Sequence, residues 1–470
     1  MDKARENRDL TKGNLLKKLI IYLLPLFLAN ILQLLFTTMD LFTVTHFGGG
    51  NISSGAIGAT GSLINLILCT FWGITGGASI VIANAKGAKD YDKVTRSIGS
   101  CILIILICGL VVLVFGAILA KPLLQLLKTS DEFIDKSTTY LTIYFLGAPF
   151  NLLYNAGAAI LRAFGDTKRP LIAVVISGII NVGLNFSMVF TLDVAGVAIA
   201  TIASQAIAML VVFYYLMFDK KLTANFKLKY LRFYKDESLD ILRLGLTTGL
   251  QSFIFNFTNV NIQMCTNVLG PEAVIGKAAS GNIDGYEYAL LNSISTTCMV
   301  AVGQNYGAKD VDRMKKTLLY SILMELVIVT IFDCIIVLCR NPLLSIFISK
   351  DEPNAKAAIE LATQALMIIG LPYALCGIPE CCSGYLRGMK YSVAPTLVSL
   401  GCIVGFRLFF IYALFDIEYF HNFMWLMLTY PISWTLCCLV YIPVCIKLSK
   451  KKFKYLRELS LKEQAIEANF

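Results

Sequence analysis

The chain has 470 residues, of which 57% are hydrophobic and only 15% are charged. Soluble proteins carry about a quarter charged residues, so this composition excludes a set of soluble domains and indicates an integral membrane protein. The formal charge is +10 and there are two histidines, His46 and His421. Two histidines exclude a histidine-rich metal centre, and the chain offers no histidine-based catalytic triad.

Apolar stretches follow one another along almost the whole chain. Twelve of them reach the roughly twenty mostly apolar residues that a membrane span requires. In chain order they cover 16–46, 53–84, 95–120, 137–161, 169–191, 194–217, 239–269, 273–304, 316–339, 357–385, 392–415 and 421–446. The sequence therefore predicts an all-α integral membrane protein with twelve transmembrane helices.

The basic residues predict the orientation of these spans. Of the 41 lysines and arginines, 33 lie in the termini and the even-numbered connections, and six lie in the connections on the other face. Positively charged segments stay on the cytoplasmic side, which places both termini in the cytoplasm. We expect a multi-pass protein of the cell (cytoplasmic) membrane whose basic loops face anionic lipid, with the lipid bilayer as a partner and no nucleic acid.

Two pairs of matching segments indicate an internal repeat. Residues 87–90 and 307–310 both read GAKD, and Arg162 with Pro170 falls on Arg387 with Pro395 at nearly the same offset. A duplicated unit of six spans starts on the same side each time, so the two halves are expected to be related by a pseudo-two-fold axis along the membrane normal. The predicted parts are an N-lobe (1–218), a cytoplasmic linker (219–238), a C-lobe (239–448) and a basic cytoplasmic tail (449–470). This layout is typical of a carrier and not of a channel.

Polar residues inside the first six spans form stripes on helix faces. The stripes comprise Asn30, Gln33, Thr37 and Asp40 in the first span, Ser177, Asn181 and Asn185 in the fifth, and Thr201 and Gln205 in the sixth. A charge inside hydrocarbon requires a partner or a water-filled cavity. Oxygen ligands around one carboxylate suit Na⁺ or a proton. Alternatively, the amides and hydroxyls only join neighbouring helices.

The second half carries a different polar pattern. A stripe of Ser252, Asn256, Asn259 and Gln263 lacks an acid, and the later spans contain Asp284, Glu287, Glu325, Asp333 and Glu380 with Lys277 and Arg407. One interpretation is an internal salt-bridge network in which Arg407 neutralises Glu380 or Asp284. The other is a substrate site with excess negative charge, where nearby tyrosines stack on a flat organic cation.

The chain resembles the multidrug and toxic compound extrusion (MATE) family over nearly its whole length. The matching stretches are PLFLANILQLLFTTMDLF (25–42), ILRAFGDTKRP (160–170), IINVGLNF (179–186), VAGVAIATIASQ (194–205), VGQNYGAKD (302–310) and LRGMKYSVAPT (386–396). The resemblance implies two six-helix lobes that export drug-like, often cationic compounds by antiport with Na⁺ or H⁺. It also implies a cation site of Asp40, Asn181, Asn185 and Thr201. Position 185 departs from the family pattern, because an amide replaces the usual acid.

These observations together predict a cation-coupled exporter of mainly cationic organic compounds, and not an enzyme. The candidate substrate-binding residues are Gln33, Thr37, Asn256, Asn259, Asp284 and Glu287. We expect no cofactor apart from the coupling ion, a Na⁺ site at Asp40, Asn181, Asn185 and Thr201, and a monomer. The alternative is a lipid-linked sugar flippase of the related superfamily, whose cavity would be basic to hold a pyrophosphate.

Overall fold

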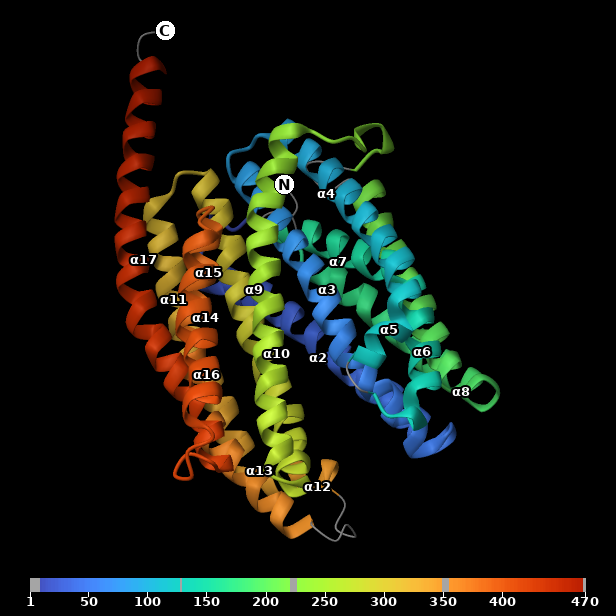
Figure 1. Cartoon of the computed structure of the whole chain (residues 1–470). Coiled ribbons are helices and arrows are strands. Elements are labelled where there is room, and N and C mark those ends of the chain that lie inside the picture. Colours follow the sequence, from blue (N-terminus) through green and yellow to red (C-terminus); the bar gives the residue numbers. More distant parts are fainter. Residues whose placement is uncertain (1–8, 127–128, 220–225, 349–354, 468–470) are drawn as a thin grey trace. The chain divides into compact units, whose positions relative to one another are not determined.

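The computed structural model describes residues 9–126, 129–219, 226–348 and 355–467, and these are helical almost throughout, with no strand among them (Figure 1). The first half contains α2 (Leu15–Phe47), α3 (Gly50–Gly87), α4 (Tyr91–Val111), η1 (Val112–Gly116), α5 (Ala117–Leu126), α6 (Asp131–Leu146), α7 (Ala148–Ala163) and α8 (Lys168–Phe218). The second half contains η2 (Leu228–Tyr230), α9 (Lys235–Val268), α10 (Pro271–Gly307), α11 (Val311–Leu338), α12 (Arg340–Phe347), α13 (Ala355–Gly370), α14 (Ala374–Gly388), α15 (Val393–Ser399), η3 (Leu400–Gly405), α16 (Phe406–Phe409), η4 (Phe410–Leu414) and α17 (Phe423–Glu467).

The helices correspond to the predicted spans, and the all-α membrane fold is confirmed. Seven helical stretches in the described residues are long and apolar enough to cross a membrane, or eight when the pair α13 and α14, bent by 47°, counts as one span. The helix α8 covers the fifth and sixth predicted spans, which are separated by a break at Asp193 with φ 49° and ψ −125°. The fourth predicted span is divided between α6 and α7, and α9 and α10 are too polar to pass the same test.

The chain forms two compact units. Unit 1 contains residues 1–13 and 20–253, and unit 2 contains residues 14–19 and 254–470. The boundary falls inside α9 and not in the predicted linker 219–238. Gly245 and Gly249 explain this, because a Cβ atom there would lie 2.5 Å from the Ile74 Cα and 2.3 Å from the Thr70 carbonyl oxygen. The first part of α9 therefore packs with its backbone directly against α3, inside unit 1.

The sequence repeat is also a repeat of backbone geometry. Lys89 and Lys309 both have positive φ, at 60° and 58°. The next residue in each copy caps the following helix, since the Asp90 carboxylate accepts from the Lys93 N–H and the Asp310 carboxylate accepts from the Arg313 N–H, each at 2.9 Å. The second matched pair behaves alike, with positive φ at Gly165 (78°) and Lys390 (66°). A residue with positive φ thus follows the second predicted span of each repeat, and another follows the fourth.

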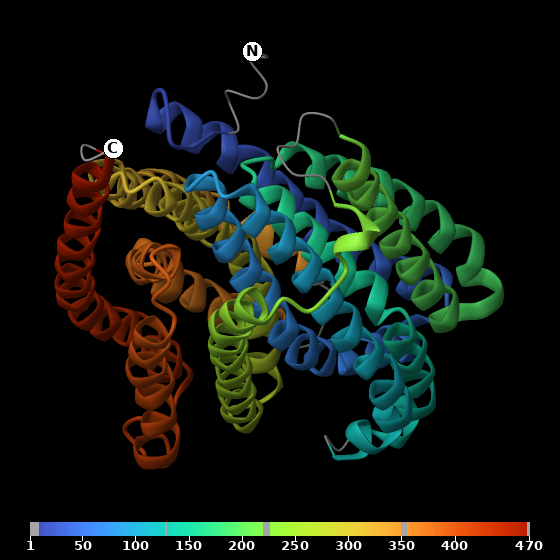
Figure 2. The same ribbon diagram turned by 90° about the horizontal axis from the view of Figure 1, so that it is seen from above.

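The last helix is longer than the sequence predicted. The span was expected to end at 446, but α17 continues as a helix to Glu467 and takes in most of the predicted tail 449–470. Figure 2 shows that this helix, drawn in red, curves along its length. Pro431 and Pro443 lie inside it, and a proline without an N–H group bends a helix in this way.

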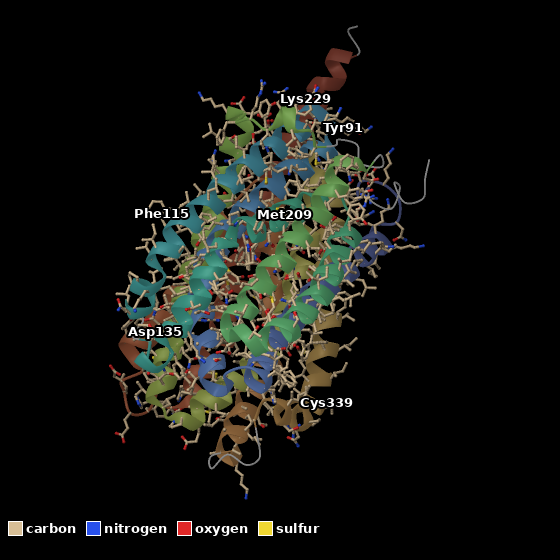
Figure 3. The ribbon with its side chains drawn as sticks, turned by 90° about the vertical axis from the view of Figure 1, so that its right-hand side faces the viewer. Tyr91, Phe115, Asp135, Met209, Lys229 and Cys339 are labelled. Atoms are coloured by element: carbon tan, nitrogen blue, oxygen red, sulfur yellow. The ribbon has the colours of Figure 1, made fainter. Side chains whose placement is uncertain are left out.

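Large apolar side chains point outward from the helices of unit 1. In Figure 3, Tyr91 and Lys229 lie at one end of this unit and Asp135 lies towards the other, with Phe115 and Met209 between them. Phe115 is 58% exposed. Large apolar side chains exposed in the middle of such helices are the expected contact surface for lipid tails.

Candidate functional site: a buried carboxylate among amides

Asp40 of α2 meets three polar side chains of α8. The Asn185 Nδ2 donates to Asp40 Oδ1 at 2.5 Å, and the Thr201 hydroxyl donates to Asp40 Oδ2 at 3.2 Å. The same Asn185 nitrogen donates to Asn181 Oδ1 at 3.3 Å. The structure therefore brings together all four residues that the sequence named for a cation site.

The break in α8 makes this arrangement possible. Asn181 and Asn185 are one helical turn apart before the break, and Thr201 lies after it. Residues 185 and 201 would be about 24 Å apart along a straight helix, so only a chain reversal lets both reach one carboxylate. Gly196 permits the two segments to approach closely, because a Cβ atom there would lie 2.6 Å from the Met188 carbonyl oxygen.

The cluster is shielded inside unit 1. Asp40 is 8% exposed, and Asn181 and Asn185 are buried as well. In the part of the chain that the structure describes, no basic side chain contacts Asp40. Two tyrosines of α6, Tyr140 and Tyr144, lie close to the Asp40 carboxylate. Asp40 thus faces protein and is not clamped by a neighbouring cation.

The atoms of this cluster fit a small hard cation. Asp40, Asn181, Asn185 and Thr201 supply only oxygen atoms as ligands, and Na⁺ is a hard cation that prefers oxygen. The Asn185 Oδ1 is buried and has no hydrogen-bond partner among the described residues. A buried acceptor without a donor is unfavourable, and a bound cation would satisfy it. The described residues hold no group of three or more His, Cys, Asp or Glu side chains suited to a metal ion.

The other two candidates of α2 differ from Asp40. Gln33 and Thr37 are exposed on the surface of the helix. The Gln33 side-chain amide donates to the Tyr154 hydroxyl at 3.3 Å, and the Thr37 hydroxyl donates to the Gln33 carbonyl oxygen at 3.1 Å. Neither side chain contacts the Asp40 cluster, so the predicted stripe divides into an exposed part and a buried end.

A second polar cluster in unit 1 was not predicted. The Asp193 carboxylate accepts hydrogen bonds from Lys136 Nζ at 2.7 Å, from Ser53 Oγ at 2.6 Å and from the Gly49 N–H at 2.9 Å. These groups come from the turn before α3, from α3 itself, from α6 and from the break in α8. The cluster therefore joins three helices at the position where α8 reverses.

The acids of unit 2 do not form the salt-bridge network that was one of the two interpretations of the sequence. In the described residues, no lysine or arginine pairs with Asp284, Glu287, Glu325 or Asp333, and Arg407 neutralises neither Glu380 nor Asp284. The sequence could not decide between the two interpretations, because helical spacing along one chain does not show which helices face each other. Lys277 instead donates to the Gln263 side-chain oxygen at 3.1 Å.

Two of these acids are neighbours. The Glu287 side chain of α10 and the Asp333 side chain of α11 lie close enough to interact electrostatically. Both are buried, and none of their four oxygens has a donor among the described residues. Two neighbouring carboxylates repel each other when both are ionised.

The remaining candidates of unit 2 belong to α9 and α10. Asp284 is half-buried, and its Oδ1 has no partner among the described residues. Asn256 and Asn259 are half-buried on α9.

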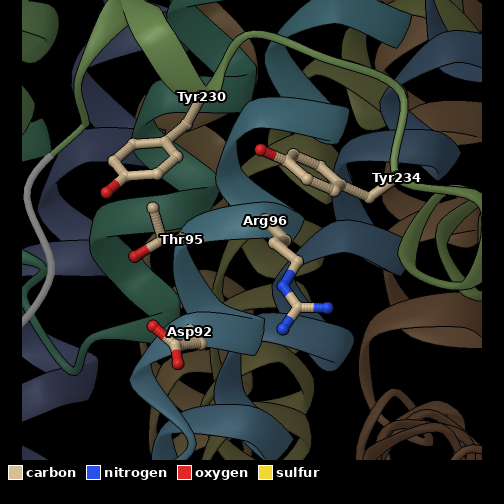
Figure 4. A pocket seen from close by; sticks show the side chains of 5 residues that line it. All are labelled: Asp92, Thr95, Arg96, Tyr230 and Tyr234. Carbon is tan, nitrogen blue, oxygen red and sulfur yellow. The ribbon is translucent and has the colours of Figure 1, made fainter.

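A small cavity in unit 1 lies away from the Asp40 cluster. It has a volume of about 190 Å³ and is lined by Asp92, Thr95, Arg96, Tyr230 and Tyr234 (Figure 4). It forms where the segment before α9 crosses the first turns of α4, and Ser100 Oγ accepts from the Tyr234 N–H at 3.2 Å to hold that segment. The cavity contains none of the predicted site residues.

Comparison with known proteins decides the family. The family model described as MatE matches residues 25–187 and 247–413, which is more than half of the chain. The chain belongs to the MATE family. This confirms the resemblance seen in the sequence, and MATE proteins are membrane transporters of multidrug efflux and not enzymes.

Relatives and solved structures agree with this assignment. The chain is 26% identical over 408 residues to "Probable multidrug resistance protein YoeA" of Bacillus subtilis (strain 168), covering 84% of this chain and 86% of that protein. It is 30% identical over 304 residues to "Probable multidrug resistance protein YpnP" of the same organism, covering 64% and 67%. A crystal structure of MATE in complex with MaL6 superposes with a TM-score of 0.85 at 19% identity, covering 97% of this chain and 100% of that one. This last likeness shows a shared fold.

Proposed function

We propose that this MATE transporter is an antiporter that exports drug-like organic cations in exchange for Na⁺ or H⁺. In this proposal it crosses the cell membrane many times with both termini in the cytoplasm, and it acts as a monomer. The observation that carries the proposal is the buried Asp40 carboxylate with its amide and hydroxyl neighbours and no basic partner.

The chemistry of the Asp40 cluster suits a reversible ion site. An ionised carboxylate in a membrane interior is unfavourable until a cation neutralises it. A Na⁺ ion would take oxygens of Asp40, Asn181, Asn185 and Thr201, whereas a proton would bind the carboxylate alone. Binding of either ion neutralises the buried carboxylate. An ion gradient then shifts the conformational equilibrium, because the charged and the neutral carboxylate favour different conformations.

The acids of unit 2 support the preference for organic cations. Asp284 keeps an oxygen without a donor, and it lies close to Tyr373, whose hydroxyl donates to the Asp284 carbonyl oxygen at 3.4 Å. A carboxylate beside an aromatic ring attracts a flat cation. Gln33, Thr37, Asn256, Asn259 and Glu287 remain the other candidates for substrate contacts. The family match favours this function over the lipid-linked sugar flippase.

An assay in proteoliposomes tests the proposal. Ethidium efflux would be measured with an imposed Na⁺ gradient, an imposed proton gradient, or neither, for the wild type, Asp40→Asn and Asp135→Asn. Asp135 is a strongly exposed acid of unit 1 and serves as the matched control. We expect Asp40→Asn to lose gradient-driven efflux and Asp135→Asn to keep it. Equal efflux by the wild type and Asp40→Asn would remove Asp40 from the mechanism.

A further inference from the structure

The connection before α9 lies with its backbone directly on α4. A Cβ atom at Gly99 would lie 2.0 Å from the Tyr230 carbonyl oxygen, so a side chain at residue 99 would prevent this approach. The Ser100 hydroxyl accepts from the Tyr234 N–H at 3.2 Å and donates to the Arg232 carbonyl oxygen at 3.5 Å. These contacts hold the two tyrosines over the first turns of α4.

Tyr230 and Tyr234 enclose, with three residues of α4, a cavity of about 190 Å³ (Figure 4). Pockets for drug-sized ligands measure about 300–1,000 Å³, so this cavity fits only a small molecule or a headgroup. Its α4 residues are Asp92, Thr95 and Arg96. Asp92 and Arg96 are exposed, so the cavity opens at the surface of unit 1.

Opposite charges line the cavity without neutralising each other. Among the residues that the structure describes, the Asp92 carboxylate forms no ion pair, and Arg96 has a single ion pair, to Glu237 at 3.9 Å. Asp92 and Arg96 are one helical turn apart on α4, and in Figure 4 their charged groups point in different directions. This arrangement fits a small ligand that carries both a negative and a positive group.

The cavity offers more hydrogen-bond donors than acceptors. The Tyr230 and Tyr234 hydroxyls have no protein partner in the described part of the chain, so both can donate to a ligand. The Arg96 guanidinium carries five N–H groups, and Asp92 supplies the carboxylate. Phosphate has several acceptor oxygens and binds arginine through two of them, whereas an ammonium group pairs with one carboxylate. A phosphate joined to an ammonium group therefore matches the lining.

An ammonium group already lies against one ring of the cavity. Lys229 Nζ is 4.9 Å from the centre of the Tyr230 ring. A tyrosine ring attracts cations through its negative face, so the aromatic lining favours a positive group as well.

Exposed apolar and basic side chains flank the cavity. Leu228 is 68% exposed and Phe233 is 58% exposed, and Lys229 and Arg232 between them are exposed too. Such a mixture is typical of a segment at the boundary between membrane and water. Figure 3 shows Lys229 at one end of unit 1, where lipid headgroups are expected. A lipid headgroup can therefore reach the cavity.

We propose that this cavity binds a phosphoethanolamine group, either as the headgroup of phosphatidylethanolamine or as the free zwitterion. Arg96 and the two tyrosine hydroxyls bind the phosphate, and Asp92 binds the ammonium group. The ligand joins α4 to the connection before α9. The site goes beyond the proposed function and does not rest on it, because binding needs no ion gradient and uses no residue of the Asp40 cluster.

The test is calorimetric titration of the purified full-length protein in detergent with O-phosphoethanolamine, inorganic phosphate and ethanolamine. We expect the wild type to bind O-phosphoethanolamine about tenfold or more tightly than either fragment, because only the zwitterion pairs with both charges. Asp92→Asn should lose the preference over inorganic phosphate and still bind phosphate. Arg96→Gln should bind both phosphate compounds about tenfold or more weakly than the wild type.

A matched pair of charges elsewhere in unit 1 supplies the controls. Lys121 and Asp135 form an exposed ion pair at 3.4 Å, and Lys121→Gln and Asp135→Asn should bind O-phosphoethanolamine like the wild type. Because Asp92 is exposed, Asp92→Asn without ligand should unfold at the temperature of the wild type. A preference for the zwitterion that persists in Asp92→Asn, equal affinity in Arg96→Gln, or no saturable binding to the wild type would overturn the proposal.

Titrations with two short-chain lipids distinguish the sources of the group. Dioctanoyl phosphatidylethanolamine is compared with dioctanoyl phosphatidylglycerol, which has a phosphate and no ammonium group. Binding of the ethanolamine lipid more tightly than O-phosphoethanolamine, with the same loss in Asp92→Asn, identifies a membrane lipid as the ligand. Tighter binding of O-phosphoethanolamine identifies the free zwitterion. Tighter binding of the glycerol lipid than of the ethanolamine lipid to the wild type would contradict the role of Asp92.

Discussion

Asn185 donates a hydrogen bond to Asp40 across 2.5 Å. The amide nitrogen also donates to Asn181, so the amide plane is held from two sides. Its oxygen has no donor among the described residues, and the two bonds of the nitrogen fix where this oxygen points. The resemblance noted in the sequence implies an acid at position 185, so the amide leaves Asp40 as the single carboxylate of this cluster.

The variant Asn185→Asp should change the coupling ion. Two carboxylates at hydrogen-bonding distance cannot both ionise, so the pair would hold a proton. We expect efflux driven by a proton gradient to persist, while stimulation by Na⁺ falls about tenfold. The measurement is ethidium efflux from proteoliposomes as a function of Na⁺ concentration and of the imposed pH difference.

Asn185→Ala provides the comparison for this variant. It removes the oxygen ligand and both hydrogen bonds without adding an acid, so Na⁺ stimulation should fall while no gain in proton dependence appears. The same Na⁺ dependence in the wild type and Asn185→Ala would show that the amide oxygen is not a ligand.

The Asp40 cluster was predictable from the sequence, because each of its residues lies on a polar face at helical spacing. Asn181 and Asn185 are one turn apart, and Asp40 ends a polar stripe in an otherwise apolar helix. The partners of Arg407 were not predictable in this way. Spacing within a helix shows which residues share a face, but the contacts of Arg407 with Phe255 and Tyr430 depend on how three separate helices pack.

The pairing of Asp193 with Lys136 was missed for a related reason. The sequence placed Asp193 at the end of a span and Lys136 in a connection 57 residues earlier, and neither position has a periodic pattern. Their contact depends on the break in α8 and on the turn at Gly49, which carry no motif. The usable signal was the pair of opposite charges next to predicted spans on the same side of the membrane.

Variants of Asp193 should distinguish side-chain bonding from backbone strain. Asp193→Ala removes the bonds to Lys136, Ser53 and Gly49, and it keeps a side chain at φ 49°. Because the pair is partly exposed, we expect a loss of about 1–2 kcal/mol in the free energy of unfolding. Asp193→Gly loses the same bonds but relieves about 1 kcal/mol of strain, so it should be the more stable of the two.

Thermal unfolding in detergent measures this difference. Lys136→Met, which removes only the cationic partner, should lie between the wild type and Asp193→Ala. An unfolding temperature of Asp193→Gly below that of Asp193→Ala would contradict the account of the break.

The repeated turns predict paired effects in the two units. Asp90→Ala and Asp310→Ala each remove a side-chain cap from the following helix and should each cost about 1 kcal/mol. Lys89→Gly and Lys309→Gly should each stabilise the protein, because glycine adopts positive φ without a Cβ clash. Thermal unfolding of the four single variants would test this, and opposite signs for the two lysines would show that the turns are not equivalent.

The contact between α3 and α9 depends on the absence of a side chain at Gly249. A Cβ atom at that position would lie 2.3 Å from the Thr70 carbonyl oxygen, which belongs to the backbone and has little room to move. Gly249→Ala should therefore separate the two helices and lower the free energy of unfolding by about 1–3 kcal/mol. Gly76→Ala is the matched control, because a Cβ atom there meets nothing within 4 Å. An alanine in the open position of a helix is more favourable than glycine by up to about 1 kcal/mol, so Gly76→Ala should unfold at the same temperature or higher. Equal unfolding temperatures of the two variants would show that the close packing of α9 on α3 does not hold the first part of α9 in unit 1.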